Sequence, residues 1–456
     1  MSLLAMFEPF LKARPVGVMA RCAIERLLDP QRLDALFERV AEKQYTHELL
    51  FSTLAELMGE VVLDWQPSVH AAYQARKKDM PVSCTAVYNK LAGMELPILE
   101  ELVRDSYQQA EPVVRKLRAS DPSWLSGYDV RVIDGNHLSA TEHRLDVLRR
   151  TWAAPLPGKA LAVYDQSKRL ICDVFLTADG HAQERSLFDR VLPTVRPKQL
   201  WIADRNFCTL GLMFSIARTG AFFVIRQHGQ LTGRLSGRRR QVGLTETGTV
   251  YEQPLVVTDP DSGEEWTVRR ITVELKTPTR DGDTEIHILT NLPAKVTAPA
   301  VAELYRQRWK IEHVFFDIDR TLHAEITSLG HPPAALFGLC VAFVAYNAVS
   351  LMMSAMEKEH GRSKVREDVS PYYLTLEIRQ SWDGIEVTIA PAAWSRIRDQ
   401  SPQQFATTLR KIARHMDLAR YQKHQRGPKR RPPPKTQYKN GGHVSTARLL
   451  AEQKTR

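Results

Sequence analysis

Apolar residues recur along this chain with different spacings, which divide it into regions. Up to about residue 120 they return every three or four positions, the spacing of amphipathic helices. Between 128 and 226 short runs of branched and apolar residues alternate with helical patterns, and between 228 and 300 strand patterns dominate. The pattern predicts an all-helical N-terminal region, then an α/β fold with a β-rich segment.

The middle region predicts a definite order of elements. Strands are expected at 130–134, 160–165, 169–176, 199–204 and 222–225, and helices near 183–192 and 209–218. Three strands, a helix, a strand, a helix and a strand is the order of a ribonuclease-H-like core, a mixed sheet flanked by helices. The β-rich segment that follows is expected to carry strands at 255–257, 266–275 and 286–289.

The first region also carries helix-capping signals. Ser83 precedes a short helical pattern that ends near Gly93, and Pro97 opens a longer one. A short helix, a glycine turn and a longer helix are typical of a helix-turn-helix unit that reads DNA. A plain helical bundle is the alternative. Further along, residues 334–356 are apolar enough to cross a membrane, but Asn347 and several small residues interrupt them, so we expect a buried core helix.

Two predicted strands each end in an aspartate, Asp134 and Asp204. An acid at the end of a strand can reach a site at the carboxyl edge of the sheet. Asp134 precedes a glycine, which is also a common turn signal, and Asp204 precedes Arg205, with which it could simply form an ion pair. Each aspartate alone is therefore weak evidence for a site.

A third acid, Glu312, lies in a segment that predicts one helix. Its spacing from Tyr305, Arg308 and Asp319 places all four on one face, beside a neighbouring apolar face. An ordinary amphipathic helix with surface charges is the alternative interpretation.

Taken in order, the segments around these acids resemble a known family. The chain resembles bacterial insertion-sequence transposases of the DDE class, in the IS-four-like branch with a Tyr-x2-Arg-x3-Glu-x6-Lys signature. The matching residues are Asp134-Gly135, Ala203-Asp204-Arg205-Asn206-Phe207, Tyr305, Arg308 and Glu312. The resemblance covers roughly residues 125 to 355, and a β-rich insertion before the glutamate is usual in this family. The family lysine is replaced here by Asp319, with Arg320 next to it.

The resemblance implies DNA cleavage and strand transfer by two Mg²⁺ ions, for which Mn²⁺ is the expected substitute. Asp134, Asp204 and Glu312 are then the catalytic and metal-binding residues, with Asp134 as the bridging ligand. Carboxylates are the side chains that Mg²⁺ prefers. Three such acids in the family's order favour this interpretation over the separate alternatives above.

Several basic and aromatic residues are candidates for contacts with DNA. Arg308 can clamp a phosphate with two hydrogen bonds, and Tyr305 can hydrogen-bond a phosphate or stack on a base. The further candidates are Arg205 and Arg320, and Arg238, Arg239 and Arg240 in a basic run near the start of the insertion. Such runs are often only solvated loops, but beside a site that cuts DNA a phosphate contact is a comparable alternative.

The net charge of +11 favours a polyanionic partner. Residues 421–456 hold ten Lys or Arg and one Glu, so the tail carries +9 and the rest of the chain is nearly balanced. The tail is also rich in proline, which predicts disorder. The five cysteines show no metal-binding spacing, and the chain has no evident signal peptide, so we expect a cytoplasmic protein with reduced thiols.

We therefore expect a helical DNA-binding domain over 1–122, a ribonuclease-H-like catalytic core over 123–227 and 301–358, a β-rich insertion over 228–300, a helical region over 359–420 and a disordered basic tail over 421–456. The expected function is a transposase that binds terminal repeats of double-stranded DNA, acts as a homodimer in the synaptic complex and needs no membrane. In part of the branch the excised ends carry a hairpin. The alternatives are a metal-dependent nuclease of the same fold that does not join DNA, and a non-catalytic DNA-binding protein derived from a transposase.

Overall fold

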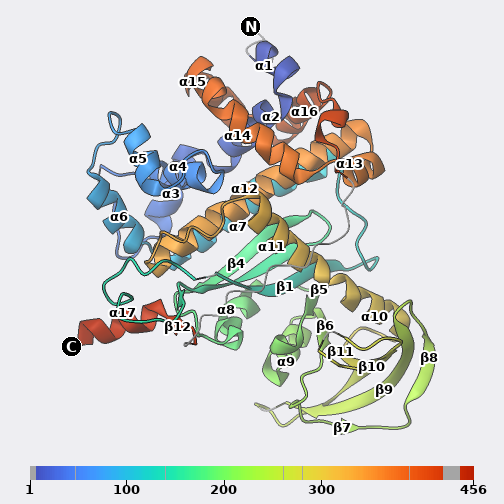
Figure 1. The fold of residues 1–456 in the computed structure, drawn as a ribbon. Helices are drawn as coiled ribbons and strands as arrows, with labels where there is room; N and C mark the ends of the chain where they lie inside the picture. Colours follow the sequence, from blue (N-terminus) through green and yellow to red (C-terminus); the bar gives the residue numbers. More distant parts are fainter. Residues whose placement is uncertain are drawn as a thin grey trace.

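The computed structural model describes residues 7–46, 48–138, 140–259, 261–279, 281–389, 391–424 and 442–455. A mixed sheet crosses the molecule, helices cover both of its faces, and a β-rich extension continues it at one end (Figure 1). The helices before the sheet are α1 (Glu8–Ala13), α2 (Pro15–Leu27), α3 (Pro30–Val40), α4 (Phe51–Val62), α5 (Val69–Ala75), α6 (Cys84–Ala92) and α7 (Leu96–Leu117).

Among the residues that the structure describes, the sheet contains ten strands in the order β4-β3-β1-β5-β6-β11-β10-β9-β7, with β8 also paired to β9. Strand β1 is antiparallel to β3 and parallel to β5, and β5 is parallel to β6. The strands are β1 (Asp129–His137), β3 (Lys159–Asp165), β4 (Leu170–Thr177), β5 (Gln199–Ala203), β6 (Phe222–Arg226), β7 (Arg234–Leu235), β8 (Arg240–Leu244), β9 (Gly248–Thr258), β10 (Glu265–Leu275) and β11 (Glu285–Thr290). The predicted strands are confirmed, and a mixed α/β fold with them.

Alternate residues of each strand enter two separate cores. Val132 of β1 and Ile202 of β5 face the core that contains α7 and α12, whereas Ile133 and Trp201 face the core under α8 and α9. The second face is covered by η2 (Glu184–Leu187), α8 (Phe188–Val191), η3 (Leu192–Thr194), η4 (Arg205–Phe207) and α9 (Leu210–Arg218). Because both faces are buried, these strands read as continuous apolar runs.

The insertion is not a separate module. Strand β11 pairs with β6, so β7 to β11 extend the same sheet instead of forming one of their own. Helix α10 (Ala298–Gln307) contacts β6 and β8 and leads the chain back to the central part of the sheet, followed by α11 (Trp309–Thr321) and α12 (Pro332–His360). The β-rich region thus fixes the point from which α10 and α11 approach the strands.

Helix α12 is the apolar helix at the centre of the molecule. Its length and composition would allow it to cross a membrane, but 83% of its most apolar window is buried, and the helix packs mainly against α7, α2 and α4. Asn347 is fully buried there, and its amide donates to Ser106 Oγ (2.9 Å) and Ile171 O (3.0 Å) while accepting from Ile171 N (2.9 Å). The predicted buried core helix is confirmed. Its buried polar residue, Asn347, hydrogen-bonds the helix to α7 and β4.

Helix α7 corrects the helix-turn-helix interpretation. The short helix α6 is capped by Ser83 as predicted, but the longer α7 lies in the core between α12 and β4. Glu100 of α7 is 2% exposed and accepts a hydrogen bond from Leu176 N, and Tyr107 donates to Asp165. A helix enclosed in this way cannot enter a DNA groove. The expected boundary at residue 122 is wrong for the same reason, because the N-terminal helices share the core of the sheet.

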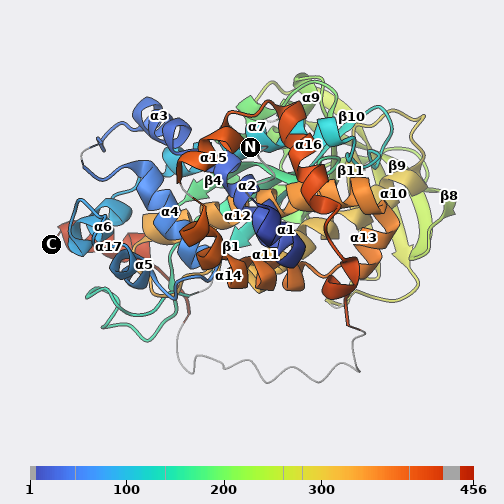
Figure 2. The ribbon, with the colours of Figure 1, turned by 90° about the horizontal axis from the view of Figure 1, so that it is seen from above.

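The chain's last helices pack on its first ones. The region expected to be helical contains α13 (Arg362–Asp368), α14 (Pro371–Thr388), α15 (Pro391–Arg398), α16 (Pro402–Ala413) and the turn η5 (Leu418–Tyr421). In Figures 1 and 2 they form a layer over α12 together with α1 and α2. Arg398 pairs with Glu25 at 2.6 Å across this layer.

The predicted disordered tail is wrong for part of its length. Strand β12 (Val444–Ser445) pairs in parallel with β2 (Pro155–Leu156), and α17 (Thr446–Thr455) follows it. Arg448 of α17 also pairs with Asp179 at 2.8 Å. The proline-rich residues 425–441, which carried most of that prediction, lie outside the described residues.

Candidate active site

Asp134 and Asp204 lie side by side because their strands are parallel neighbours. The last pair between β1 and β5 joins Val132 to Ile202, and each aspartate comes two residues later. Both therefore project from the same face, at the edge where the two strands separate. Asp134 does not end its strand as predicted: β1 continues to His137 and still pairs with β3 there.

Asp204 begins the turn η4 and is fixed by it. Its Oδ1 accepts a hydrogen bond from Asn206 N at 2.8 Å, the arrangement of a helix cap. Arg205 points into solvent, so the turn holds one carboxylate inward and leaves one cation exposed.

The helix expected to carry Glu312 is broken at Arg308. Helix α10 ends at Gln307 and α11 begins at Trp309. Arg308 N donates to Tyr305 O, and Arg308 O accepts from Ile311 N. Both hydrogen bonds span three residues, as in a 3₁₀ helix, so the backbone is locally tighter than an α-helix on both sides of Arg308. The prediction of one continuous helix is wrong at this residue, and Arg308 gains a direction toward the sheet that a straight helix does not supply.

Arg308 connects two of the three acids. Its Nη1 donates to Asp134 Oδ2 at 2.7 Å, and its Nη2 donates to Glu312 Oε1 at 2.8 Å. Arg308 is 7% exposed, whereas the Glu312 side chain is 41% exposed. A buried guanidinium thus links β1 to α11 and brings the two carboxylates to one place.

Negative charge exceeds positive charge among Asp134, Asp204, Glu312 and Arg308. Burial raises the pKa of Asp134 to about 7, Arg308 opposes that rise, and the charges of Asp204 and Glu312 add to it. The pKa of Arg308 is raised, since the attraction of Asp134, Tyr305 and Glu312 outweighs the effect of burial. The three predicted acids therefore act on one another, and Arg308 is the arginine that contacts two of them.

A fourth acid, Glu184, stands against the same strand and was missed by the sequence analysis. It belongs to η2, and its Oε1 would lie 2.1 Å from a Cβ placed on Gly135. Burial raises the pKa of Glu184, the charge of Asp204 raises it further, and a hydrogen bond from the side chain of Asn206 lowers it. The sequence hint was Gly135 itself, because a glycine inside a strand marks a close approach.

The carboxylates of Asp134, Asp204 and Glu312 are suitable ligands for a hard divalent cation, although their side chains are not arranged around one ion. Oxygen ligands with excess negative charge are what Mg²⁺ binds. Within the described ranges, no three His, Cys, Asp or Glu side chains are close enough together to hold an ion as they stand. Arg308 occupies the space between Asp134 and Glu312 and supplies the positive charge there.

These residues fall inside a segment that matches a known family. Residues 125–348 match the transposase DDE domain. The matched segment is just under half of the chain and includes Asp134, Asp204 and Glu312.

Two further proteins resemble the chain. The curated "Putative transposase y4zB" of Sinorhizobium fredii (strain NBRC 101917 / NGR234) is 33% identical over 149 residues, which are 32% of this chain and 40% of that protein. The similarity thus spans well under two thirds of the relative's length. The cryo-EM structure of the piggyBac transposase synaptic complex with hairpin DNA is 9% identical, with a TM-score of 0.37 over 87% of this chain and 85% of the other. The family match and the curated relative support a DDE-type transposase.

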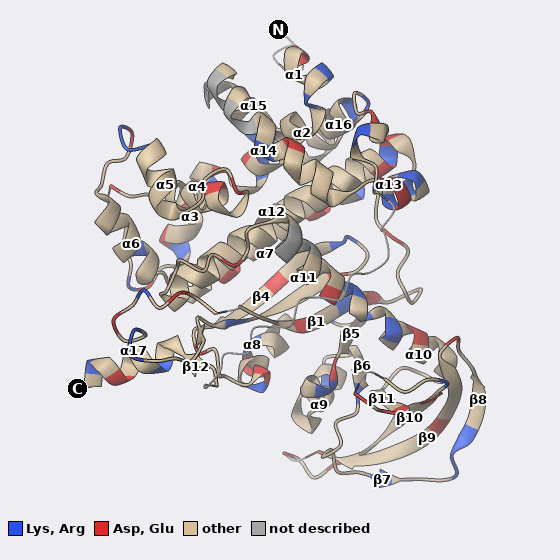
Figure 3. Ribbon diagram, viewed as in Figure 1, with Lys and Arg blue, Asp and Glu red and all other residues tan. Residues whose placement is uncertain are grey.

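The candidate DNA contacts of the matched segment are unequally placed. Tyr305 is 7% exposed and packs beside Arg308, whose guanidinium lies 6.0 Å from the ring centre. Neither side chain faces solvent, so their predicted contacts with DNA remain predictions that require a local opening. The side chains of Arg320 and Asp319 lie outside the described part of the chain. Figure 3 shows basic residues where α10 meets α11.

The basic run of the insertion lies at its outer strands. Arg238 and Arg240 are exposed, and Arg240 begins β8. Arg239 pairs with Glu285 at 2.8 Å and lies over the Tyr251 ring, 4.0 Å from its centre. Arg239 is thus engaged within the insertion, while its two neighbours remain available for the predicted phosphate contact.

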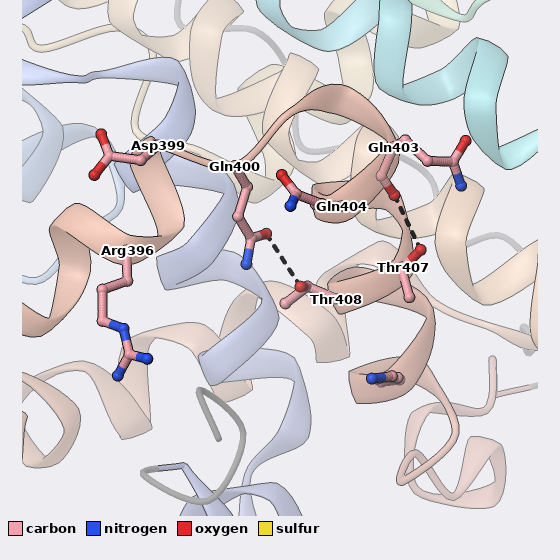
Figure 4. A pocket seen from close by; sticks show the side chains of 8 residues that line it. Arg396, Asp399, Gln400, Gln403, Gln404, Thr407 and Thr408 are labelled. Atoms are coloured by element: carbon pink, nitrogen blue, oxygen red, sulfur yellow. Dashed lines mark hydrogen bonds between the residues drawn. The ribbon is translucent and has the colours of Figure 1, made fainter. Parts of the chain in front are cut away.

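A separate polar pocket of about 480 Å³ lies between α15 and α16 (Figure 4). Gln400 accepts a hydrogen bond from Thr408 in it, and its charged lining residues are Arg396, Asp399 and Lys411. One carboxylate among cations does not suit the binding of divalent metals. The pocket also lies outside residues 125–348, so we do not assign the chemistry of the transposase DDE domain to it.

Proposed function

We propose that this chain is an insertion-sequence transposase that binds the terminal repeats of its element and moves DNA by cleavage and strand transfer. The observation that carries the proposal is the convergence of Asp134, Asp204 and Glu312 around Arg308 inside the matched domain. Three carboxylates from two neighbouring strands and one helix are the composition that two-metal DNA cleavage requires.

We further propose that β1, β3, β4, β5 and β6 with their helices form a ribonuclease-H-like core. The order β4-β3-β1-β5-β6, with two antiparallel pairs on one side of β1 and two parallel pairs on the other, supports this. In such an arrangement β1 is central, which explains why its aspartate meets acids from both the neighbouring strand and the covering helix.

Asp134, Asp204 and Glu312 would hold two Mg²⁺ ions, or Mn²⁺ in their place. When bound, the ions would activate the attacking oxygen and stabilise the charge that develops on the phosphate. The chain's own contribution is positional: β1 and β5 set the spacing of two carboxylates, and Arg308 holds Glu312 toward them. Burial raises the pKa of Asp134 to about 7, and the charges of Asp204 and Glu312 add to the rise, as expected where several acids share one site.

Double-stranded DNA is the proposed partner, both as terminal repeats and as target. We place its phosphates near the junction of α10 and α11, where Arg308 approaches the acids and Arg205 is exposed. We also propose that the protein acts as a homodimer in the synaptic complex and is cytoplasmic. We further propose that it belongs to the Tyr-Arg-Glu-Lys branch, with Arg320 beside the substituted Asp319.

The test is incubation of the protein with Mg²⁺ and DNA that carries its own element's ends. Joined products support a transposase, whereas cut ends without joining would indicate a nuclease of the same fold. Asp134→Ala, Asp204→Ala and Glu312→Ala should each abolish cleavage and leave end binding largely intact. Glu303→Ala, at a half-buried acid of α10 paired with Arg306, is the matched control. Near-normal cleavage by any of the three variants would remove that residue from the site.

A further inference from the structure

A pocket of about 570 Å³ lies at the edge of the sheet where its parallel strands begin. Tyr128 directly precedes β1, Lys198 directly precedes β5, and Phe222 is the first residue of β6. Asp134 lies five residues beyond the start of β1, which is about 16 Å along an extended strand. The pocket is therefore separate from the candidate active site, although the same strands carry both.

Two aromatic side chains line the pocket. The rings of Tyr128 and Phe222 meet edge to face, with their centres 5.0 Å apart and their planes at 84°. Both residues are only partly buried, so a further ring can stack against this pair. The other described lining residues, apart from two lysines, are Leu125, Ser126, Gly127, Val296, Thr297 and Ala300.

The two lysines bring positive charge to the same pocket. Lys198 and Lys295 are exposed, and in the described part of the chain neither side chain forms an ion pair. No acidic residue belongs to the described lining, and Asp129, which follows Tyr128 in the chain, pairs with Arg131 at 2.8 Å. The charge of both lysines is therefore uncompensated within the pocket, which favours an anionic ligand.

The backbone fixes the place of Lys198. Its φ of 67° lies in the left-handed region that residues other than glycine seldom adopt. Its N–H donates to Gly220 O at 3.1 Å, and its carbonyl accepts from Asp129 N at 3.3 Å. The turn thus connects the beginnings of β1, β5 and β6, and it holds the base of the Lys198 side chain at the pocket.

We propose that this pocket binds a nucleoside phosphate, with the base against Tyr128 and Phe222 and the phosphates between Lys198 and Lys295. A flat aromatic group and an anion in one small molecule satisfy both kinds of lining residue. The volume lies within the range of pockets for small organic ligands, about 300–1,000 Å³. The inference goes beyond the proposed function, because the pocket shares no residue with the acids or with Arg308.

A free nucleotide fits this lining better than inorganic phosphate or duplex DNA does. Inorganic phosphate would contact the lysines and leave the rings uncovered. A duplex presents phosphates to a protein surface but keeps its bases inside the stack, where they cannot reach the two rings. A free nucleotide carries both groups in reach of the pocket.

The experiment is isothermal titration calorimetry of the full-length protein in buffer with EDTA, which keeps metal ions away from the acids. The probes are ADP, adenosine and inorganic pyrophosphate. ADP should bind at least about ten times more tightly than either of the others, because each of those supplies only one of the two groups.

The variants separate the two parts of the ligand. Lys198→Gln and Lys295→Gln should each weaken the binding of ADP and of pyrophosphate by about tenfold, the loss expected for one charge-assisted contact. Phe222→Leu, which keeps an apolar side chain there, should weaken ADP and leave pyrophosphate unchanged. Lys77→Gln, at an exposed lysine outside the pocket, is the matched control and should change neither affinity.

The proposal is overturned if ADP binds no more tightly than pyrophosphate. It is also overturned if the double variant of Lys198→Gln and Lys295→Gln binds ADP as the wild type does. Displacement of ADP by a 30-base-pair duplex would assign the pocket to DNA and would overturn the proposal as well. None of these measurements involves cleavage, so failure of the proposed function leaves their outcome unaffected.

Discussion

The carboxylate of Glu184 lies against the backbone of Gly135 on β1, so close that a Cβ at Gly135 would be 2.1 Å from Glu184 Oε1. The absence of a side chain at Gly135 is therefore what allows η2 to approach the strand that carries Asp134. Glu184 also accepts a hydrogen bond from the Asn206 side chain, and Asn206 N in turn binds Asp204. Glu184 and Asn206 therefore link the position of Asp134, through Gly135, to the position of Asp204.

The first prediction follows from that contact. Gly135→Ala should displace Glu184, lower the free energy of unfolding by about 1–3 kcal/mol and reduce cleavage. Adding Glu184→Ala should recover most of the lost stability, because the clash is then absent, and a double-mutant cycle measures this coupling. Gly211→Ala, in α9 with nothing within 4 Å of its added Cβ, is the control. Additive effects of the two substitutions would contradict the contact.

The second prediction concerns Arg308, which contacts Asp134 and Glu312. Arg308→Ala leaves Asp134 buried and unpaired, so it should cost about 3 kcal/mol of stability at pH 8, measured by urea unfolding. It should also weaken end binding and cleavage by roughly 1.5–3 kcal/mol. Arg308→Lys should not restore either, since an ammonium cannot bridge two carboxylates as the guanidinium does.

Arg306→Ala is the control for that variant. Arg306 belongs to the same helical segment, is 49% exposed and pairs with Glu303 and Glu246 on the surface. Its loss should change stability by less than about 1 kcal/mol. Equal losses in the two variants would show that the position of Arg308 between the acids has no special effect.

The third prediction is a pH dependence. Burial raises the pKa of Asp134 from an ordinary 3.8 to about 7, so the native state holds this proton more tightly than the unfolded chain does. That contribution to stability is complete below about pH 4 and is lost as the pH rises through 7. Asp134→Asn should therefore raise the melting temperature in metal-free buffer at pH 8, on the order of 5 °C, and give no gain at pH 4. Asp146→Asn, at a side chain that is 81% exposed, should show no such trend. A gain that is the same at both pH values would refute the assignment.

The sequence was sufficient for the strands and for the helices that follow simple periodicity. Val130 to Asp134 and Gln199 to Asp204 are short apolar runs with an acid at a fixed place, and local pattern alone locates them. Their closeness depends on the parallel pairing of β1 with β5, which local pattern does not contain.

Other features depend on contacts between distant residues, and local pattern does not contain them. The break at Arg308 arises because that side chain reaches Asp134, which is 174 residues away in the chain. Helix α7 has the pattern of an ordinary amphipathic helix, yet its polar Glu100 and Tyr107 bind the sheet and so place it in the core. The helix α17 was missed because the charge and proline content of the preceding segment dominated the composition of the tail.

The last prediction concerns residues 425–441, which contain six Lys or Arg and no acid. Basic side chains that contact phosphates release counterions and carry no sequence information, so this segment should raise general DNA affinity without setting specificity. Truncation after residue 424 is a poor test, because it also removes the pairing of β12 with β2 and the ion pair of Arg448 with Asp179.

Substitution of the six cations by Gln keeps those contacts. It should flatten the dependence of log affinity on log salt by up to about 5, while the ratio of affinities for element ends and random DNA stays constant. Permuting the same seventeen residues, which preserves the charge, should change neither quantity. If the Gln variant lost the discrimination between ends and random DNA, or if the permuted variant did, the segment would be reading sequence and the electrostatic explanation would be wrong.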